Sequence, residues 1–379
     1  MRNRQRTSLA RPGRLALAGA LAALGLAASV QAAPAFAAAS GTFTATGSMT
    51  TTRYEDTATL LPDGEVLVAG GGTASAELYN PATGTFMATG SMTTQRSGQT
   101  ATLLPDGQVL VAGGGIATAE LYNPATGTFK ATGSMTTEQD QATATLLPDG
   151  QVLVTGGGTA AAEVYNPASG TWAKTGSMTT ARLDQTATLL PNGQVLVVGG
   201  SDATGDALAS AELYNPATGT FTATASMSAA REGHTATLLG NGEVLVVGGI
   251  DAEFTYALVS ELYNPATGTW SDSSGGLIEC TPQFWCRYNS AAVLLGSGEV
   301  LVEGGLSGQV SSYGSGSTSG AMLYDPATNS WTTTGNMITP RERQTATLLP
   351  DGQVLVAGGN DYNHHGTGGV LASAELYTP

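Results

Sequence analysis

The chain has 379 residues, 41% of them hydrophobic, and carries 29 acidic against 14 basic residues for a net charge of −15. This hydrophobic content is enough to bury a core, which excludes an intrinsically disordered chain. The acidic surface repels phosphate groups, so we expect no nucleic-acid partner and no attraction to anionic lipid.

The first forty residues predict a secretory signal. Five arginines precede position 15, and an apolar run rich in Ala and Leu follows over 15–30. Small residues then offer cleavage after Ala32 or Ala37, the pattern of a signal peptide over 1–37. A retained membrane anchor is the alternative, but the run is short for one. We expect a secreted protein, extracellular or in the cell envelope, that is not embedded in a membrane.

From residue 41 onward, one unit recurs seven times. The stretch 100–114 reads Thr-Ala-Thr-Leu-Leu-Pro-Asp-Gly-Gln-Val-Leu-Val-Ala-Gly-Gly, which predicts two strands around a tight turn closed by Gly107. A third strand ends near Tyr122, and an Asn-Pro-Ala-Thr-Gly turn leads to a fourth strand headed by Phe129. Residues 41–379 show no helical periodicity. Seven units of four antiparallel strands predict one all-β domain over 41–379, a seven-bladed β-propeller.

The two ends of the domain predict how the ring closes. The chain stops at 377–379, after the third strand of the last unit. Phe43 belongs to a fourth strand that has no unit before it. We therefore expect a strand at about 42–46 to complete blade seven, which removes the exposed edge of an open array.

The repeat resembles the kelch-repeat and galactose-oxidase-like propellers. The resemblance rests on an Arg before the first strand, a Gly-Gly pair after the second, and spaced Tyr and Trp residues, all in register over seven units. It implies the propeller fold but no single activity, because kelch propellers serve many roles. Galactose oxidase itself uses copper with two Tyr, two His and a Cys crosslinked to one Tyr. This chain has no Tyr-His dipeptide and its two Cys are expected to pair, so we predict no cofactor and keep copper as an alternative.

The two faces of the predicted disc differ. The Pro-Asp-Gly and Asn-Pro-Ala-Thr-Gly turns share one nearly invariant face, while the loops after Gly-Gly and the connectors between blades share the other, which we call the variable face. Its loops lengthen in blades four to seven, as 71–77 against 305–322 illustrates. The long connector into blade six holds Cys280 and Cys286, which predict a disulfide.

Aromatic and imidazole side chains outside the repeat gather on the variable face. Aromatic rings stack on sugars and anchor interfaces, so we predict that this face binds a carbohydrate or a protein ligand. The candidate binding residues are Tyr54, Arg231, His234, Tyr256, Trp285, Tyr288, Arg343, Asp361, Tyr362 and His364.

One arginine position precedes the first strand in six of the seven blades, with Gln139 in its place in blade three. A ring of guanidinium groups could bind carboxylates. A structural tie to neighbouring backbone is the interpretation we favour for this position. Arg343 lies outside the repeat and is the better ligand candidate.

Two other classes of function stay open. An enzyme on the variable face, either a sugar lyase or epimerase or a metal-dependent oxidase, would use His234, His364 or His365. A structural or adhesive repeat protein would need no pocket. We lean against catalysis and expect a monomer.

Calcium is a further alternative for the variable face. Asp202 with Asp206, and Asp251 with Glu253, place carboxylate pairs in its loops, and calcium prefers oxygen ligands. Their spacing matches no recognised calcium loop.

Overall fold

The computed structural model describes residues 41–251, 257, 259–277, 287–307, 316–362 and 368–379. The chain divides into Met1–Ala35 and Phe36–Pro379, and only the second unit contains described residues. No helix among these residues is long and apolar enough to cross a membrane.

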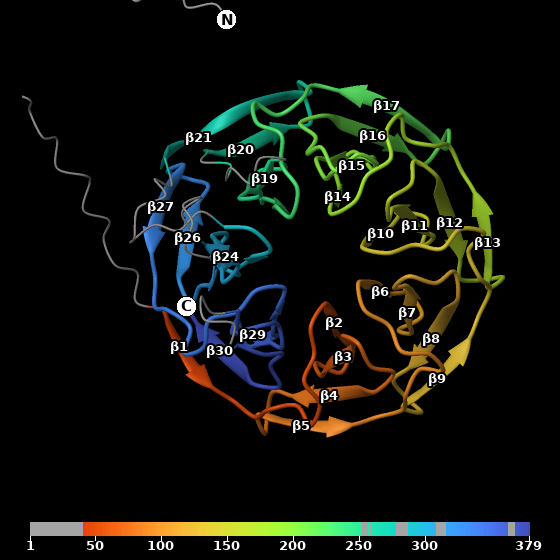
Figure 1. Cartoon of the computed structure of the whole chain (residues 1–379), viewed down its shortest axis with the longest axis vertical. Helices are drawn as coiled ribbons and strands as arrows, with labels where there is room; N and C mark the ends of the chain where they lie inside the picture. The colour runs from red at the N-terminus through yellow and green to blue at the C-terminus, as the bar shows by residue number, and fades with distance from the viewer. Residues whose placement is uncertain (1–40, 252–256, 258, 278–286, 308–315, 363–367) are drawn as a thin grey trace, which may run out of the picture. The chain divides into compact units, whose positions relative to one another are not determined.

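Seven four-stranded antiparallel sheets stand around a central axis as the blades of a propeller (Figure 1). Blades one to three consist of β2 (Asp56–Leu60), β3 (Val66–Gly70), β4 (Ala76–Asn80) and β5 (Thr85–Ala88); β6 (Gln99–Leu103), β7 (Val109–Gly113), β8 (Ala119–Asn123) and β9 (Thr128–Ala131); and β10 (Ala142–Leu146), β11 (Val152–Gly156), β12 (Ala162–Asn166) and β13 (Thr171–Lys174).

Blades four to six follow the same order, and blade six carries a small additional hairpin. Their strands are β14 (Thr186–Leu189), β15 (Val195–Val198), β16 (Ala211–Asn215) and β17 (Thr220–Thr224); β18 (Thr235–Leu238), β19 (Val244–Val247), β20 (Val259–Asn264) and β21 (Thr269–Leu277); and β22 (Ala291–Leu294), β23 (Val300–Glu303), β26 (Ala321–Asp325) and β27 (Ser330–Thr333), with the hairpin β24 (Leu306–Ser307) and β25 (Gly316–Ser317).

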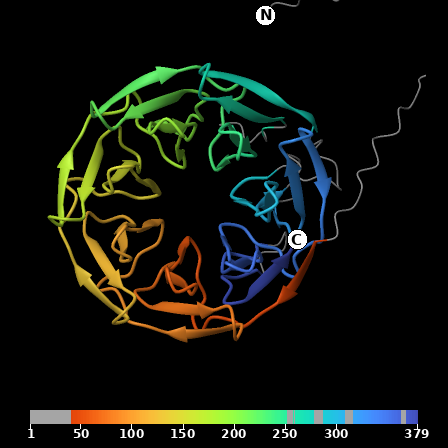
Figure 2. The ribbon, with the colours of Figure 1, turned by 180° about the vertical axis from the view of Figure 1, so that it is seen from behind.

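Blade seven joins the two ends of the domain, as the sequence predicts. It consists of β28 (Thr345–Leu348), β29 (Val354–Ala357), β30 (Ala374–Thr378) and β1 (Thr42–Ala45). Phe43 stands opposite Tyr377 in the register of β1 and β30, and the two ring centroids are 4.9 Å apart. The first strand therefore lies beside the last one at the outer edge of the disc (Figures 1 and 2).

The hydrophobic core lies between neighbouring blades. One cluster, for example, joins Val66 and Val68 of blade one to Leu355 and Ala357 of blade seven. The turn glycines have the positive φ that the sequence pattern requires, 84° at Gly107. A tight turn that ends in such a Gly links the first two strands of every blade, and neighbouring blades pack through the same strand faces.

Candidate functional site

The repeated arginines are structural ties within each blade. In all six blades the Nη1 group donates to the carbonyl oxygen of the first Gly of the Gly-Gly pair at 2.7–3.0 Å. Five of these arginines also pair with the Glu of the third strand at 2.6–3.3 Å, and these pairs are almost fully buried. The interpretation of this position as a structural tie is confirmed.

Two blades lack this Arg–Glu pair, and the residue that remains in each finds other hydrogen-bond partners. Blade three has Gln139 in place of Arg, and Glu163 accepts hydrogen bonds from the backbone of Thr136 and Thr137 instead. Blade six has Met322 in place of Glu, and Arg287 donates to the carbonyl oxygens of Gly304 and Gly320 at 2.7 and 2.9 Å. The buried Glu303 lies nearby, at the end of β23. Burial raises the pKa of Glu303 to about 8, against the opposing effect of Arg341.

The residue two positions after the repeated arginine faces the central channel. We call these seven residues the rim positions: Glu55, Gly98, Gln141, Asp184, Gly233, Asn289 and Arg343. All seven have positive φ, from 49° to 63°. In five of the seven steps around the ring, the amide of one rim residue donates to the carbonyl of the rim residue before it, at 2.9–3.2 Å. The rim positions thus form a circle of backbone around the channel mouth.

Five rim positions carry a polar side chain in a backbone region that favours glycine. A left-handed backbone costs a non-glycine residue roughly 1 kcal/mol, less for Asn. Blades two and five show that glycine fits here, at Gly98 and Gly233. Strain that the fold could avoid is typical of functional sites.

The next residue in each blade forms the channel wall. We call these residues the wall positions: Asp56, Gln99, Ala142, Gln185, His234, Ser290 and Gln344. Gln99 donates from Nε2 to the carbonyl of Ala69 in the preceding blade at 2.8 Å, and Gln185 and Gln344 make the equivalent bond at 3.0 Å. A Cβ atom at Gly70 would lie 2.1 Å from that Nε2 atom, and Gly70 has a φ of 75°, so this position favours glycine. These three wall glutamines hold neighbouring blades together.

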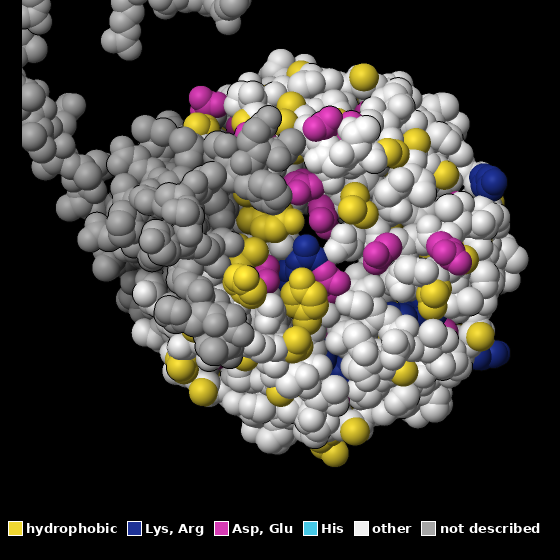
Figure 3. Space-filling view, in the orientation of Figure 1, with side chains coloured by type: hydrophobic (Ala, Val, Ile, Leu, Met, Phe, Trp, Pro, Cys, Tyr) yellow, Lys and Arg dark blue, Asp and Glu magenta, His cyan; other side chains and the backbone are white. Residues whose placement is uncertain are grey.

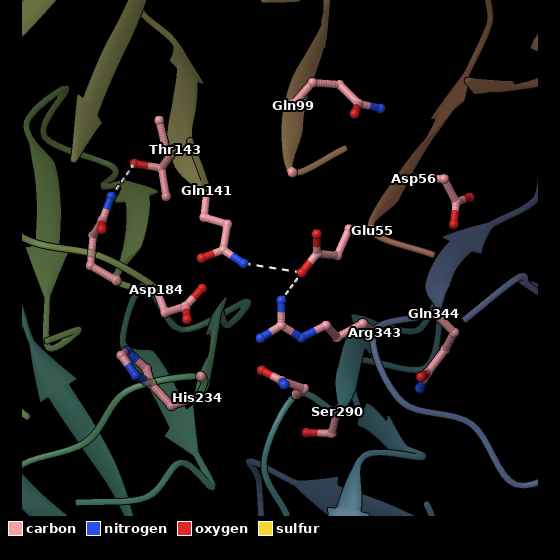
Figure 4. A pocket seen from close by; sticks show the side chains of 15 residues that line it. Glu55, Asp56, Gln99, Gln141, Thr143, Asp184, His234, Ser290, Arg343 and Gln344 are labelled. Carbon is pink, nitrogen blue, oxygen red and sulfur yellow. Dashed lines mark hydrogen bonds and ion pairs between the residues drawn. The ribbon is translucent and has the colours of Figure 1, made fainter. Parts of the chain in front are cut away.

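Rim and wall positions line one cavity of about 300 Å³ at the channel mouth. Arg343 pairs with Glu55, which also accepts a hydrogen bond from Gln141 at 3.0 Å (Figure 4). The guanidinium carbon of Arg343 lies 5.7 Å from the centre of the Tyr54 ring. Blades one, three and seven therefore meet in one polar cluster across the channel.

Asp184 points into the same cavity from blade four (Figure 4). Burial raises its pKa to about 6, helped by Glu232 and Asp140. Among the described residues no hydrogen bond or ion pair reaches its carboxylate. The space-filling view shows a basic group at the centre of the ring with acidic and hydrophobic groups around it (Figure 3).

The structure brings some predicted site residues to this cavity. His234 and Arg343 line it, and Tyr54 lies against Arg343. Tyr288 packs on the rim residue Gly233, where an added Cβ would lie 2.1 Å from the Tyr288 ring.

Other predicted residues lie elsewhere. Arg231 is fully buried and bonded to Gly248 and Glu261, so its guanidinium does not reach the cavity. Asp361 and Tyr362 accept hydrogen bonds from Ser317. Predicted residues outside the described part of the chain are Tyr256, Trp285, His364 and the pair Cys280 and Cys286.

His234 is a wall residue whose ring is held in place. Its Nε2 atom lies 3.0 Å from the Thr186 hydroxyl. Burial and the nearby Arg231 lower its pKa to about 3, so the ring is neutral. It therefore cannot supply a proton near neutral pH.

The rim residues Glu55, Gln141, Asp184 and Asn289 were not among the predicted binding residues. A signal for them exists in the sequence: the position two after the repeated arginine holds only Gly or a polar residue. Gly at two of the seven equivalent places indicates a backbone with positive φ. Polar residues at the other five places would then be strained, which indicates that their side chains have a function.

No cluster of three metal-ligating side chains occurs within the described ranges. The Oδ1 atom of Asp202 accepts from the Thr204 hydroxyl at 2.6 Å and from the amide of Asp206, so this carboxylate closes its own loop. The described residues therefore do not fit a copper site, and we derive no step through copper.

Comparison with known proteins agrees with this architecture. The kelch motif matches residues 185–228. No curated protein matches the sequence. A solved structure described as a novel fungal alcohol oxidase with catalytic diversity among the AA5 family, in complex with copper, has a TM-score of 0.71 and 18% sequence identity, covering 89% of this chain and 75% of that one. At this identity the likeness concerns the fold alone. The chain is therefore a seven-bladed β-propeller that contains a kelch motif and shares its fold with that oxidase.

Proposed function

We propose that this propeller binds a carbohydrate at the channel mouth on its variable face. The observation that carries the proposal is the set of five polar rim residues held at positive φ where glycine would avoid the strain. Their side chains share one cavity, and five different blades supply them. Because five blades supply these side chains, their relative positions depend on the packing of the whole ring.

The chemistry of the cavity favours a sugar over an apolar ligand. Carboxylate, amide and guanidinium groups of Glu55, Gln141 and Arg343 offer both hydrogen-bond donors and acceptors. Tyr54 and Tyr288 add aromatic rings beside them, and such rings stack on the apolar face of a sugar. A volume of about 300 Å³ suits a small part of an oligosaccharide.

Glycine substitutions at the rim provide a sharp test. Gln141→Gly and Asn289→Gly remove side chains while the backbone keeps the conformation already seen at Gly98. We expect a glycan array probed with wild type to show binding that both variants weaken at least tenfold. Asn329→Gly, at a turn with φ of 50° outside the cavity, is the matched control. Equal signals from wild type and both rim variants would refute the site.

Export is part of the proposal. The basic start and apolar run over 1–37 support secretion, with binding taking place outside the cell or in its envelope. Mass spectrometry of the protein from its culture medium would give a first residue of Ala33 or Ala38. Retention of the whole N-terminus inside the cell would contradict export.

A second candidate function is acid–base chemistry on the bound sugar. The observation that favours it is Asp184, whose pKa is raised to about 6 while Glu55 is held by Arg343. Two carboxyl groups in different environments are typical of glycosidases and lyases. Release of oligosaccharides by wild type, lost in Asp184→Asn, would support it. Binding of the oligosaccharide without its cleavage would refute this second function and leave only the binding function.

A further inference from the structure

Six of the seven junctions between neighbouring blades share the same two polar ties. In each of the six, the Tyr hydroxyl of the third strand shares a hydrogen bond with a Thr hydroxyl at the end of the preceding blade's outer strand, at 2.8–2.9 Å. An amide of the connector that enters the blade also donates to the Glu carboxylate of the third strand, at 2.7–3.0 Å. Hydrogen bonds are directional, so these ties fix how one blade is set against the next.

The junction between blades five and six has neither tie among the described residues. Blade six has Met322 where the other blades have Glu, so this position offers no carboxylate to the connector. Tyr324 donates its hydroxyl to Asn329 of its own blade at 2.8 Å. Ser273 occupies the place of the Thr, and its hydroxyl pairs with Ser260, again within its own blade. Both hydroxyls of the missing bond are therefore satisfied on their own side of the junction.

The partners that satisfy these hydroxyls are specific to the two blades. Ser260 stands where the other six blades have Ala. Asn329 stands where blades one to five have Gly, and its φ is 50°, in the left-handed region that its Gly counterparts also adopt. One substitution in each blade thus supplies an internal partner, and together they remove the bond between the blades.

Apolar packing joins the outer parts of blades five and six instead. Leu262 of blade five belongs to one buried cluster with Met322 and Trp331 of blade six. Such packing is non-directional, so it allows the two blades to shift against each other. Trp331 is 2% exposed, and its Nε1–H group has no acceptor. An unpaired buried donor destabilises the closed arrangement.

The equivalent indoles show what Trp331 lacks. Trp172 and Trp270 donate from Nε1 to a carbonyl oxygen of the chain that leaves the preceding blade, at 2.9 and 2.8 Å. Each of these two bonds crosses a junction between blades. The junction of blades five and six is thus also without the bond that its own Trp could make.

The channel side of this junction is intact. The Gly249 amide donates to the Arg287 carbonyl at 2.7 Å, a bond that recurs at all seven junctions. The Asn289 amide donates to the Gly233 carbonyl at 2.9 Å. In the part of the chain that the structure describes, these are the two hydrogen bonds that join blade five to blade six.

We infer that the ring opens at the junction between blades five and six, with the two backbone bonds on the channel side as the hinge. The outer parts of the blades separate while each blade keeps its own sheet and its own hydroxyl pair. Gly233 and Asn289 line the cavity, so the opening changes the shape of the channel mouth. The inference does not depend on which ligand binds there. It also differs from opening at blade seven, where the two ends of the chain meet and both neighbouring junctions keep their ties.

Thiol labelling of buried cysteines measures the opening. Val302→Cys places a thiol in the cluster between blades five and six, Val111→Cys between blades one and two, and Val68→Cys between blades seven and one. All three valines are 0% exposed, so a reagent reaches them only after local opening. Under native conditions we expect Val302→Cys to react roughly tenfold faster than the other two. Wild type, in which Cys280 and Cys286 are expected to pair, gives the background.

A matched pair of hydroxyl deletions tests the cause of the difference. Tyr122→Phe removes a hydroxyl that bonds across the junction of blades one and two, and should speed the labelling of Val111→Cys about threefold. Tyr324→Phe removes the equivalent hydroxyl, which bonds within blade six, and should leave the labelling of Val302→Cys unchanged. Met322→Glu supplies the carboxylate that the other blades have and should slow the labelling of Val302→Cys.

The labelling rates can also overturn the inference. Equal rates for Val302→Cys, Val111→Cys and Val68→Cys would do so, because global unfolding exposes all three alike. The fastest rate at Val68→Cys would place the opening where the chain ends meet. If Val302→Cys does not fold, Val300→Cys reports on the same cluster, with Val109→Cys as its counterpart between blades one and two.

Discussion

Arg343 of blade seven pairs with Glu55 of the neighbouring blade one. Both residues occupy rim positions with positive φ, 49° and 56°. Gln141 of blade three reaches the same carboxylate at 3.0 Å. One polar cluster therefore joins blades one, three and seven and lines the candidate ligand site.

Closure by the first strand can be tested at Phe43. This side chain is 9% exposed and packs against Tyr377, so Phe43→Ala should lower the free energy of unfolding by roughly 3 kcal/mol. Chemical denaturation measures the change. Met87→Ala, in an outer strand with 67% exposure, is the control and should have almost no effect. An unchanged midpoint for Phe43→Ala would show that the strand does not hold the ring.

The buried ion pairs predict an asymmetric response to mutation. Arg96→Met leaves Glu120 buried without its cation and should cost about 3–5 kcal/mol. Replacing Glu120 by Met as well should recover much of this loss, as blade six already has Met322 at the equivalent position. Denaturant titration of both variants measures the difference, with the exposed Lys130→Met as control. A double variant less stable than the single one would contradict the argument.

Glu303 predicts a stability that falls as pH rises. Its pKa is about 8 in the folded protein against 4.5 for an ordinary glutamate, so between these values folding holds a proton that unfolding releases. Stability from this group is present below about pH 4.5 and is lost by about pH 8. Glu303→Gln keeps an acceptor for Gln344 and removes the titration.

The measurement for Glu303 is the difference in melting temperature between wild type and Glu303→Gln. The two should be similar at pH 5, and the variant should be more stable at pH 8.5. Glu299→Gln, in the exposed turn of the same blade, should follow wild type throughout. A constant difference over the whole range would mean that Glu303 does not titrate there.

The strain at the rim predicts a trade between stability and binding. Asp184→Gly should raise the free energy of unfolding by roughly 1 kcal/mol, because glycine relieves the left-handed backbone. Loss of repulsion from Glu232 and Asp140 adds to the gain. Asp184→Asn removes the charge but retains most of the backbone strain, so it separates the two contributions. Thermal unfolding measures both variants, and a destabilised Asp184→Gly would show that the carboxylate stabilises the fold.

Much of the architecture is predictable because the repeat is local. The Pro-Asp-Gly turn, the Gly-Gly pair and the Tyr of the third strand each act within a few residues, and seven copies in register leave one arrangement of blades. Phe43 without a preceding unit is enough to predict closure through β1, and the structure confirms it. The buried role of the repeated arginines follows from the same local pattern.

The site depends on contacts that the repeat does not encode. Glu55, Gln141 and Arg343 are separated by many residues and come together only when the ring closes. Whether a side chain beside the repeated arginine faces the channel or the blade is decided by backbone φ and by the neighbouring blade. Arg231 and Asp184 show the difference. Both are charged residues that precede the first strand of a blade, but Arg231 is buried inside its blade whereas Asp184 lines the cavity. Local sequence sets the blade, and only closure of the ring places charges from distant blades at one point.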